Sequence, residues 1–182
     1  MEEFEAVRRC RAGDRAAFRF LVERYGDLVQ RTAYLIVRDE GLAEDLAQEA
    51  FLAAWKGLAT FDPSQPLKPW LVRIVVNRCL NQERRSHPPS QPLGDDLPEA
   101  TSPSPETVTL ARDAGRLVRG AIASLDEEQR LALVLRYFAD LTVPEIAWVL
   151  GCPEGTVKSR LHRSLAALRE RLADQAELPH AG

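Results

Sequence analysis

The stretch that decides the fold, residues 141–172, reads LTVPEIAWVLGCPEGTVKSRLHRSLAALRERL. Thr142 and Glu145 have the spacing of a capping box, and Pro144 suits the first helical turn that follows. Gly151 predicts the end of this short helix, because glycine enters the left-handed conformation at little cost. Apolar residues then recur every three or four positions, which predicts a second helix with one buried face, formed by Val157, Leu161, Leu165 and Leu168.

The predicted second helix carries cations on the face opposite its apolar residues. From residue 154 to residue 172 there are five Lys or Arg side chains and two acidic ones. A short helix, a tight turn and a helix with outward cations form the arrangement that places side chains in the major groove of DNA. The alternative is an ordinary amphipathic helix pair with a solvated basic face, and the turn signals favour DNA binding over it. The residues predicted to face outward are Ser159, His162 and Arg163, flanked by Lys158 and Arg160.

The chain as a whole is slightly acidic, although it carries basic patches. Its 182 residues include 24 Lys or Arg and 27 Asp or Glu, which gives a formal net charge of −3. Hydrophobic residues make up 45% and charged residues 28%, as in ordinary soluble globular proteins. This composition excludes a general polycation, so any contact with nucleic acid must come from local basic patches.

The sequence contains no recognisable targeting segment or metal-binding pattern. The first ten residues, MEEFEAVRRC, lack the basic start and apolar run of a signal peptide. No window approaches the roughly 20 apolar residues that span a bilayer. Cys10, Cys79 and Cys152 form no CxxC pair, and the histidines lack ligand spacing to them. We therefore expect a cytoplasmic protein with no metal and no cofactor.

Composition divides the chain into four segments. Residues 1–85 have helical apolar spacing, whereas residues 86–106 hold six of the 12 prolines, four acids and no Lys or Arg. Such a segment is typical of a semi-extended linker without a core of its own. Helical periodicity returns over residues 107–174, and residues 175–182 have the composition of a frayed tail. The sequence thus predicts an all-α fold of two small helical domains joined by a flexible Pro-rich linker.

The N-terminal domain is predicted to hold about four helices. The first runs from near Asp14 past Tyr25, and the next continues the pattern after Gly26, from near Asp27 to Val37. We assign the aromatic residues of these segments to the core and give them no functional role.

Residues 43–58 predict a helix with one apolar face and one acidic face. At 100° per residue, the acidic face holds Asp45, Gln48, Glu49, Leu52 and Lys56. A solvated helix face would explain the charges, and a single exposed leucine is ordinary. A leucine ringed by polar side chains also has the make-up of a protein-binding patch, with an apolar centre and a polar rim. Both interpretations stay open on these residues alone.

A basic helix is predicted over residues 68–85, which read KPWLVRIVVNRCLNQERR. An aromatic ring beside guanidinium and amide groups suits unpaired nucleic acid, because the ring stacks on a base while the cations hold phosphates. The loop of residues 61–68 holds two prolines and could form a pocket for a flipped base. The alternative for Trp70 is a core residue that Arg73 snorkels past. The residues that share this stripe are Trp70, Arg73, Asn77, Asn81 and Arg84.

Three segments together resemble a known family. AEDLAQEAFLAAW, PWLVRIVVNRCLNQERR and GTVKSRLHR, arranged around a Pro-rich linker, resemble the sigma-70 superfamily of RNA polymerase sigma factors. With two domains only, the chain is similar to the extracytoplasmic-function group of alternative sigma factors. The resemblance covers about residues 5–172 and implies that residues 1–85 are sigma region 2 and residues 107–174 are region 4.

The resemblance also implies a role for each patch. In the family, the acidic helix of region 2 docks on the β′ clamp helices of core RNA polymerase, which implies Asp45, Gln48, Glu49 and Leu52. The helix after Pro69 and the loop before it open the −10 element, which implies Asp62, Ser64, Trp70, Arg73, Asn77 and Asn81, with Arg84 and Arg85 toward phosphates. The second helix of the helix-turn-helix reads the duplex −35 element, which implies Lys158, Ser159, His162 and Arg163, with Thr156 and Arg160 nearer the backbone.

We therefore expect an alternative sigma factor that directs promoter-specific transcription initiation and is not itself an enzyme. The implied partners are core RNA polymerase, through its β′ clamp helices and β flap, promoter DNA, and an anti-sigma factor that is often membrane-linked. We expect a monomer when free and no small-molecule substrate. Two other classes of protein fit these residues less well. A plain transcription regulator would need neither the Trp70 stripe nor the acidic face, and a nucleic-acid enzyme would need clustered acids or a histidine-based site.

Overall fold

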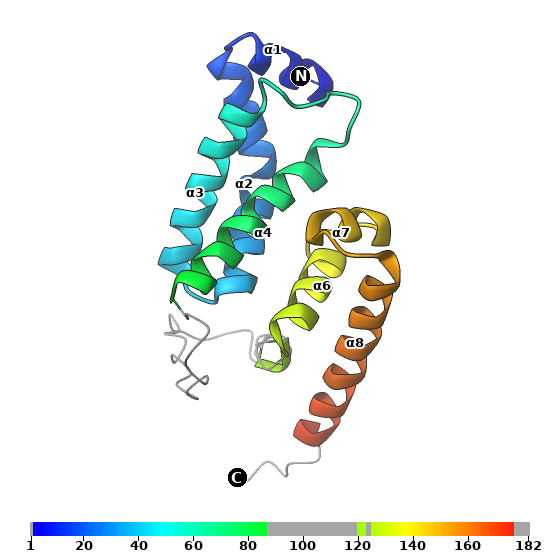
Figure 1. Ribbon diagram of the computed structural model, residues 1–182. Helices are drawn as coiled ribbons and strands as arrows, with labels where there is room; N and C mark the ends of the chain where they lie inside the picture. The colour runs from blue at the N-terminus through cyan, green and yellow to red at the C-terminus, as the bar shows by residue number, and fades with distance from the viewer. Residues whose placement is uncertain (1, 87–119, 123–124, 177–182) are drawn as a thin grey trace.

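The computed structural model describes residues 2–86, 120–122 and 125–176. Within these residues the regular secondary structure is entirely helical, which confirms the predicted all-α fold (Figure 1). Residues 87–106 of the predicted linker, residues 107–119, and residues 177–182 of the predicted tail lie outside the described residues. The helices are α1 (Glu3–Arg11), α2 (Arg15–Val37), α3 (Glu40–Gly57), α4 (Leu67–Ser86), α6 (Glu127–Tyr137), α7 (Val143–Leu150) and α8 (Glu154–Ala176).

Residues 2–86 form four helices, but the first two differ from the expected ones. Helix α1 was not predicted from the sequence, and α2 runs unbroken through Gly26, where two successive segments were expected. Packing along the whole of α2 outweighs the roughly 1 kcal/mol that an interior glycine costs a helix. The start of α2 was predicted correctly, because the Asp14 carboxylate caps it by accepting from the backbone N–H groups of Ala16 and Ala17.

Helix α1 is held by contacts with α2 that lie far away in sequence. It buries Ala6, Val7 and Cys10, and the Tyr25 hydroxyl of α2 donates a hydrogen bond to the Glu3 carboxylate. Nine residues are too few for a stable helix on their own, so this packing supplies the stability that local propensity lacks. Helix α1 is therefore stabilised by its packing on the bundle of α2, α3 and α4.

The bundle of α2, α3 and α4 buries the apolar faces that the sequence predicts. Ala47, Ala50 and Ala54 of α3 are buried, and small residues of this kind allow close approach of neighbouring helices. Val76 and Cys79 of α4 are fully enclosed. Burial raises the pKa of the Cys79 thiol to about 12, so this cysteine is a small apolar core residue and not a reactive one.

The predicted helix-turn-helix is present and has the expected caps. Thr142 and Glu145 form a complete capping box at the start of α7, and Gly151 ends that helix with φ 63°. The predicted buried stripe of α8 is only partly correct, because Val157 is buried whereas its three leucines are half-buried. The fully buried residue next along α8 is Ser164, whose hydroxyl lies 2.7 Å from the Arg160 carbonyl oxygen and 3.0 Å from that of Gln129.

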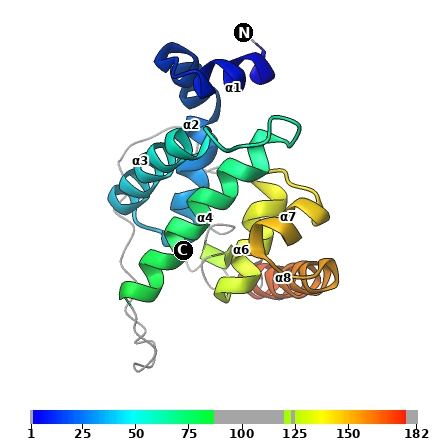
Figure 2. The same cartoon turned by 45° about the horizontal axis from the view of Figure 1, so that its top comes forward.

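The two helical units pack against each other instead of standing apart. One hydrophobic core contains Val72 and Val76 of α4 together with Leu135 of α6 and Ile146 of α7. Figures 1 and 2, which differ by a turn of the view, both place α4 beside α6 and α7. No helix within the described ranges is both long and apolar enough to cross a membrane.

Candidate nucleic-acid interface

The acidic face of α3 is exposed and has an apolar centre. Leu52 is 64% exposed, although it is a large apolar side chain on a helix whose opposite face is buried. The Glu49 carboxylate lies 3.3 Å from the Arg78 guanidinium of α4, and such an exposed ion pair contributes little to stability. The exposed residues that form this face are Asp45, Gln48, Glu49 and Leu52.

A shallow acidic groove lies next to this face, between α2 and α3. It has a volume of about 360 Å³, and its lining includes Glu23, Asp27, Glu44 and Gln48. Gln48 belongs both to the groove and to the acidic face, so the two features are continuous. The surface therefore combines an exposed leucine with a negatively charged hollow.

Trp70, at the start of α4, is held in place from one side and open on the other. Its ring lies 4.7 Å from the ring of Phe61, centroid to centroid, at an interplanar angle of 45°. On α3, a Cβ atom added to Gly57 would come within 2.9 Å of Trp70 Cζ2, so only glycine allows this approach. Trp70 is half-buried. Its burial is therefore intermediate between that of a core residue and that of an exposed ring that can stack on a base, which are the two roles that the sequence left open.

The loop before α4 is fixed by its own polar side chains. The Asp62 carboxylate accepts hydrogen bonds from the backbone N–H of Ser64 at 2.9 Å and from the Ser64 hydroxyl at 2.8 Å. These bonds, the backbone one first, hold the pKa of Asp62 below its usual range. Both residues are exposed, so the loop presents an ordered carboxylate and hydroxyl beside Trp70.

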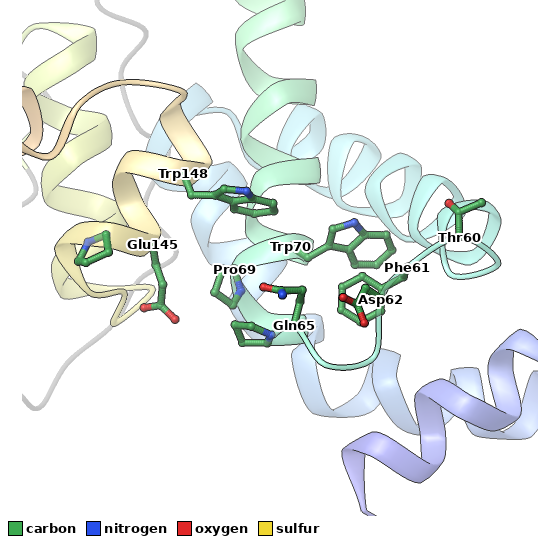
Figure 3. A pocket seen from close by; sticks show the side chains of 10 residues that line it. Thr60, Phe61, Asp62, Gln65, Pro69, Trp70, Glu145 and Trp148 are labelled. Atoms are coloured by element: carbon green, nitrogen blue, oxygen red, sulfur yellow. The ribbon is translucent and has the colours of Figure 1, made fainter.

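A cavity of about 400 Å³ opens at this point between the two helical units (Figure 3). Phe61, Asp62 and Trp70 line it from the first unit, and Glu145 and Trp148 of α7 line it from the second. In Figure 3 the Trp148 indole extends from α7 toward α4, and the Trp70 indole lies beside Phe61 and Asp62. A hollow with aromatic walls and a few polar groups is the form that a ligand-binding site takes.

The α4 stripe divides into a covered end and an exposed end. The Arg73 guanidinium carbon lies 4.5 Å from the centroid of the Trp148 ring, in a cation–π contact. Further along α4, the predicted residues lie on the surface as expected. They are Asn77, Asn81, Arg84 and Arg85.

Most of the side chains predicted to read DNA from α8 are exposed. Arg160 differs from the others, because its side chain is 15% exposed and its guanidinium lies 2.6 Å from the Glu128 carboxylate of α6. In this arrangement Arg160 ties α8 to α6. Thr156 is half-buried, and the exposed members of the set are Lys158, Ser159, His162 and Arg163.

Trp148 and Glu145 both line the cavity, although the sequence did not predict a functional role for either of them. Their spacing was the signal in the sequence, because residues three positions apart lie on the same face of a helix, and both of these line the cavity. Trp148 is 46% exposed, which is unusual for a tryptophan in so apolar a helix. Among the described residues, no group of three or more His, Cys, Asp or Glu could hold a metal ion.

Replacing Gly57 by alanine tests whether the position of the Trp70 ring matters. The new methyl group would displace the ring, since its Cβ atom would lie 2.9 Å from Trp70 Cζ2. We expect a shifted tryptophan fluorescence spectrum and promoter opening reduced several-fold, with the protein still folded. Gly41→Ala, whose added Cβ would have ordinary contact distances, is the matched control. Unchanged opening by Gly57→Ala would mean that the ring's position is unimportant.

The helix-turn-helix of α7 and α8 and the stripe along α4 are two separate candidate surfaces for nucleic acid. Family models for sigma-70 region 2 and sigma-70 region 4 match residues 21–87 and 115–168. The RNA polymerase sigma-H factor of Pseudomonas aeruginosa is 33% identical, over 94% of this chain and 94% of its own. The ECF RNA polymerase sigma-E factor of Escherichia coli K12 is 35% identical, over 91% of this chain and 92% of its own.

The solved structure of CnrH in complex with the cytosolic domain of CnrY is similar over 94% of this chain and 97% of that one. Its TM-score is 0.72 and its sequence identity 27%. Similarity to relatives that extends over both helical units establishes the family. The chain belongs to the extracytoplasmic-function sigma factors of the sigma-70 superfamily.

Proposed function

We propose that the protein binds core RNA polymerase and directs it to promoters by reading a −35 element as duplex and a −10 element as unpaired DNA. The main support for this proposal is that one chain holds two different candidate DNA-binding surfaces, the α4 stripe and the exposed face of α8. Both lie within the residues matched by sigma factors. In this assignment residues 1–85 act as region 2 and residues 107–174 as region 4. A regulator that binds only duplex DNA would not need the Trp70 stripe, because duplex DNA presents no unpaired bases for stacking.

The proposed −35 reader is the exposed face of α8. Side chains at the start of a recognition helix reach base edges, and arginine paired with guanine is the commonest specific contact. Ser159, His162 and Arg163 are placed for base edges, and Lys158 for a phosphate. Thr156 and Arg160 lie nearer the DNA backbone in this proposal. Arg160 contributes mainly by holding α8 on α6, given its ion pair with Glu128.

The proposed −10 reader is the surface made by the loop at Asp62 and the stripe along α4. Opening costs a few kcal/mol of unstacking, which capture of unpaired bases must offset. Trp70 supplies an aromatic surface for stacking, and Asp62 and Ser64 supply an ordered carboxylate and hydroxyl. The remaining members are Arg73, Asn77 and Asn81 for bases, and Arg84 and Arg85 for phosphates.

The proposed polymerase contact is the acidic face of α3 with Leu52 at its centre. The partner surface is the β′ clamp helices, and the β flap meets region 4. CnrH has been solved with CnrY, and a sigma factor RpoE from Bartonella quintana with its anti-sigma factor NepR. We therefore assign an anti-sigma factor as a further partner, membrane-linked in many members of the family.

The protein performs no covalent chemistry in this proposal, because the polymerase forms the phosphodiester bonds. Its contribution is sequence specificity, supplied by two modest contact sets that act together when both elements lie at a permitted spacing. It works in the cytoplasm with core polymerase, is monomeric before binding, and needs no cofactor.

Arg163→Ala tests the −35 assignment. We expect transcription by the holoenzyme to lose about 1–3 kcal/mol of discrimination at one or two −35 base pairs and to keep its −10 preference. The measurement is multi-round transcription on a promoter and its single-base −35 variants. Arg169→Ala, at an exposed arginine six residues further along α8, is the control. Equal discrimination by Arg163→Ala and the parent at every position would contradict the assignment.

A further inference from the structure

The recognition helix α8 is fastened to α6 by two side chains that lie about one turn apart. The Arg160 guanidinium lies 2.6 Å from the Glu128 carboxylate of α6. The buried Ser164 hydroxyl lies 3.0 Å from the Gln129 carbonyl oxygen, also of α6. Figures 1 and 2 both place α8 alongside α6. Two contacts on one side of a helix, about 6 Å apart along its axis, fix both its roll and its position along its neighbour.

The side chains proposed to read bases lie on other faces of α8. Arg160 and Ser164 are about 40° apart around the helix axis, because they are four residues apart. Ser159, His162 and Arg163 lie further round the helix and are exposed. The contacts with α6 therefore set the direction in which the reading face of α8 points.

A small roll of α8 is enough to disturb base reading. A helix with its side chains has a radius of about 5–6 Å, so a roll of about 20° moves the side-chain tips by about 2 Å. Hydrogen bonds to base edges require donor–acceptor distances of about 2.7–3.2 Å, and such a shift breaks them. Attraction between cations and phosphates acts over longer distances and carries no sequence information, so it survives the same roll. Base discrimination therefore depends on the roll of α8 more steeply than phosphate binding does.

Arg160 depends on Glu128 because its remaining hydrogen bonds are weak. The Arg160 side chain is 15% exposed, and one terminal nitrogen lies 3.8 Å from the sulfur of Cys152, which is a weak acceptor. Among the residues that the structure describes, the Nε atom of Arg160 has no hydrogen-bond partner. Loss of the Glu128 carboxylate would leave a mostly buried guanidinium with too few acceptors, which favours a swing of the side chain toward water. The contact that fixes the roll of α8 at Arg160 would then be lost.

Glu128 acts from outside the helix that meets DNA. It lies in the first turn of α6, and its side chain is 63% exposed, so its removal opens no cavity in the core. Glu127 is also acidic and exposed in the same turn, but the Arg160 guanidinium contacts Glu128. The two acids are therefore a matched pair, of which Glu128 is the one that holds Arg160.

We propose that Glu128 is a positioning residue for −35 recognition, which sets the roll of α8 through Arg160 without touching DNA. This inference rests on the proposed function, because it requires that the exposed face of α8 reads the −35 element. It adds a residue outside the helix-turn-helix that determines sequence discrimination. Arg160 stays on α6 when DNA is bound, and Lys158 and the other exposed cations of α8 supply the attraction to phosphates.

The experiment compares Glu128→Ala with Glu127→Ala in the full chain bound to core polymerase. Both changes remove one negative charge from the first turn of α6, so their effects on net charge and on the helix dipole are matched. The DNA is a promoter identified by run-off transcription, together with its single-base −35 variants. Multi-round transcription measures the discrimination at each −35 base pair. A hydroxyl-radical footprint shows whether α8 still covers the −35 backbone, and thermal unfolding reports stability.

Glu128→Ala should lower the discrimination by about fivefold or more at most −35 base pairs at once, whereas Arg163→Ala acts at one or two of them. The −35 footprint and the unfolding temperature should stay near those of the parent protein and of Glu127→Ala. Glu128→Gln keeps an oxygen that accepts from Arg160, so it should retain at least about half of the parent's discrimination. The proposal is overturned if Glu128→Ala discriminates as well as Glu127→Ala. It is also overturned if the footprint is lost together with the discrimination, because Glu128 would then only stabilise the fold.

Failure of this proposal can be told apart from failure of the proposed function. If the parent protein discriminates among the −35 variants and Glu128→Ala does so equally, the positioning role alone is wrong. If the parent protein directs transcription without any preference among the −35 variants, the −35 assignment is wrong as well.

Discussion

Replacing Leu52 by aspartate should lower the affinity for core RNA polymerase by about 30-fold or more, or about 2 kcal/mol. An apolar residue at the centre of an interface contributes most when neighbouring polar groups exclude water from it. Leu52 is 64% exposed and surrounded by Asp45, Gln48 and Glu49, so it has this position on the acidic face of α3. Aspartate removes the apolar contact and leaves a charge to be desolvated.

The measurement is a titration of labelled protein with core polymerase, followed by fluorescence anisotropy. Phe4→Asp is a matched control, because Phe4 is also a large apolar side chain and is 61% exposed, on α1. Since both residues are exposed, neither change should lower the thermal unfolding temperature appreciably. If Leu52→Asp bound core polymerase as tightly as the parent protein, the acidic face would be an ordinary solvated surface.

Trp70→Ala should reduce promoter opening by between about fivefold and a hundredfold. Stacking of a base on an aromatic ring is worth about 1–3 kcal/mol, and this energy offsets the unstacking of the −10 strand. Binding of the closed complex to duplex DNA should change little, because α8 supplies that contact. The measurement is permanganate reactivity of unpaired thymines in the −10 region.

Two controls separate this role from a core role of Trp70. Trp70→Phe keeps a ring against Phe61 and should retain much of the opening activity. A promoter with a preformed bubble should partly rescue Trp70→Ala, because the unstacking cost has already been met. Normal opening by Trp70→Ala would assign this residue to the core. An equal loss on bubble and duplex promoters, together with lower thermal stability, would do the same.

The parts of the fold that the sequence predicted are those fixed by local interactions. The helix-turn-helix depends on Thr142, Glu145 and Gly151, which act on neighbours within four residues. The buried faces of α3 and α4 follow from helical periodicity alone. The exposure of Lys158, Ser159, His162 and Arg163 on α8 follows from the same periodicity, whereas the Arg160 side chain is ion-paired with Glu128.

The features that the sequence did not predict depend on contacts between distant segments. α1 is held by Tyr25 bonding to Glu3, 22 residues away. The contact of Arg73 with Trp148 requires the two helical units to pack together, and the proline-rich composition between them suggested that they stand apart. Gly57 was also missed, because its role depends on where the Trp70 ring comes to lie.

The most direct test of the account is run-off transcription from a genomic fragment library, with core RNA polymerase and with or without this protein. We expect discrete start sites that appear only with the protein, each preceded by shared −10 and −35 sequences. These starts should disappear with Leu52→Asp and persist with Phe4→Asp. Duplex DNA binding by the protein alone, with no new start sites at any concentration of core polymerase, would contradict the account and favour an ordinary transcription regulator.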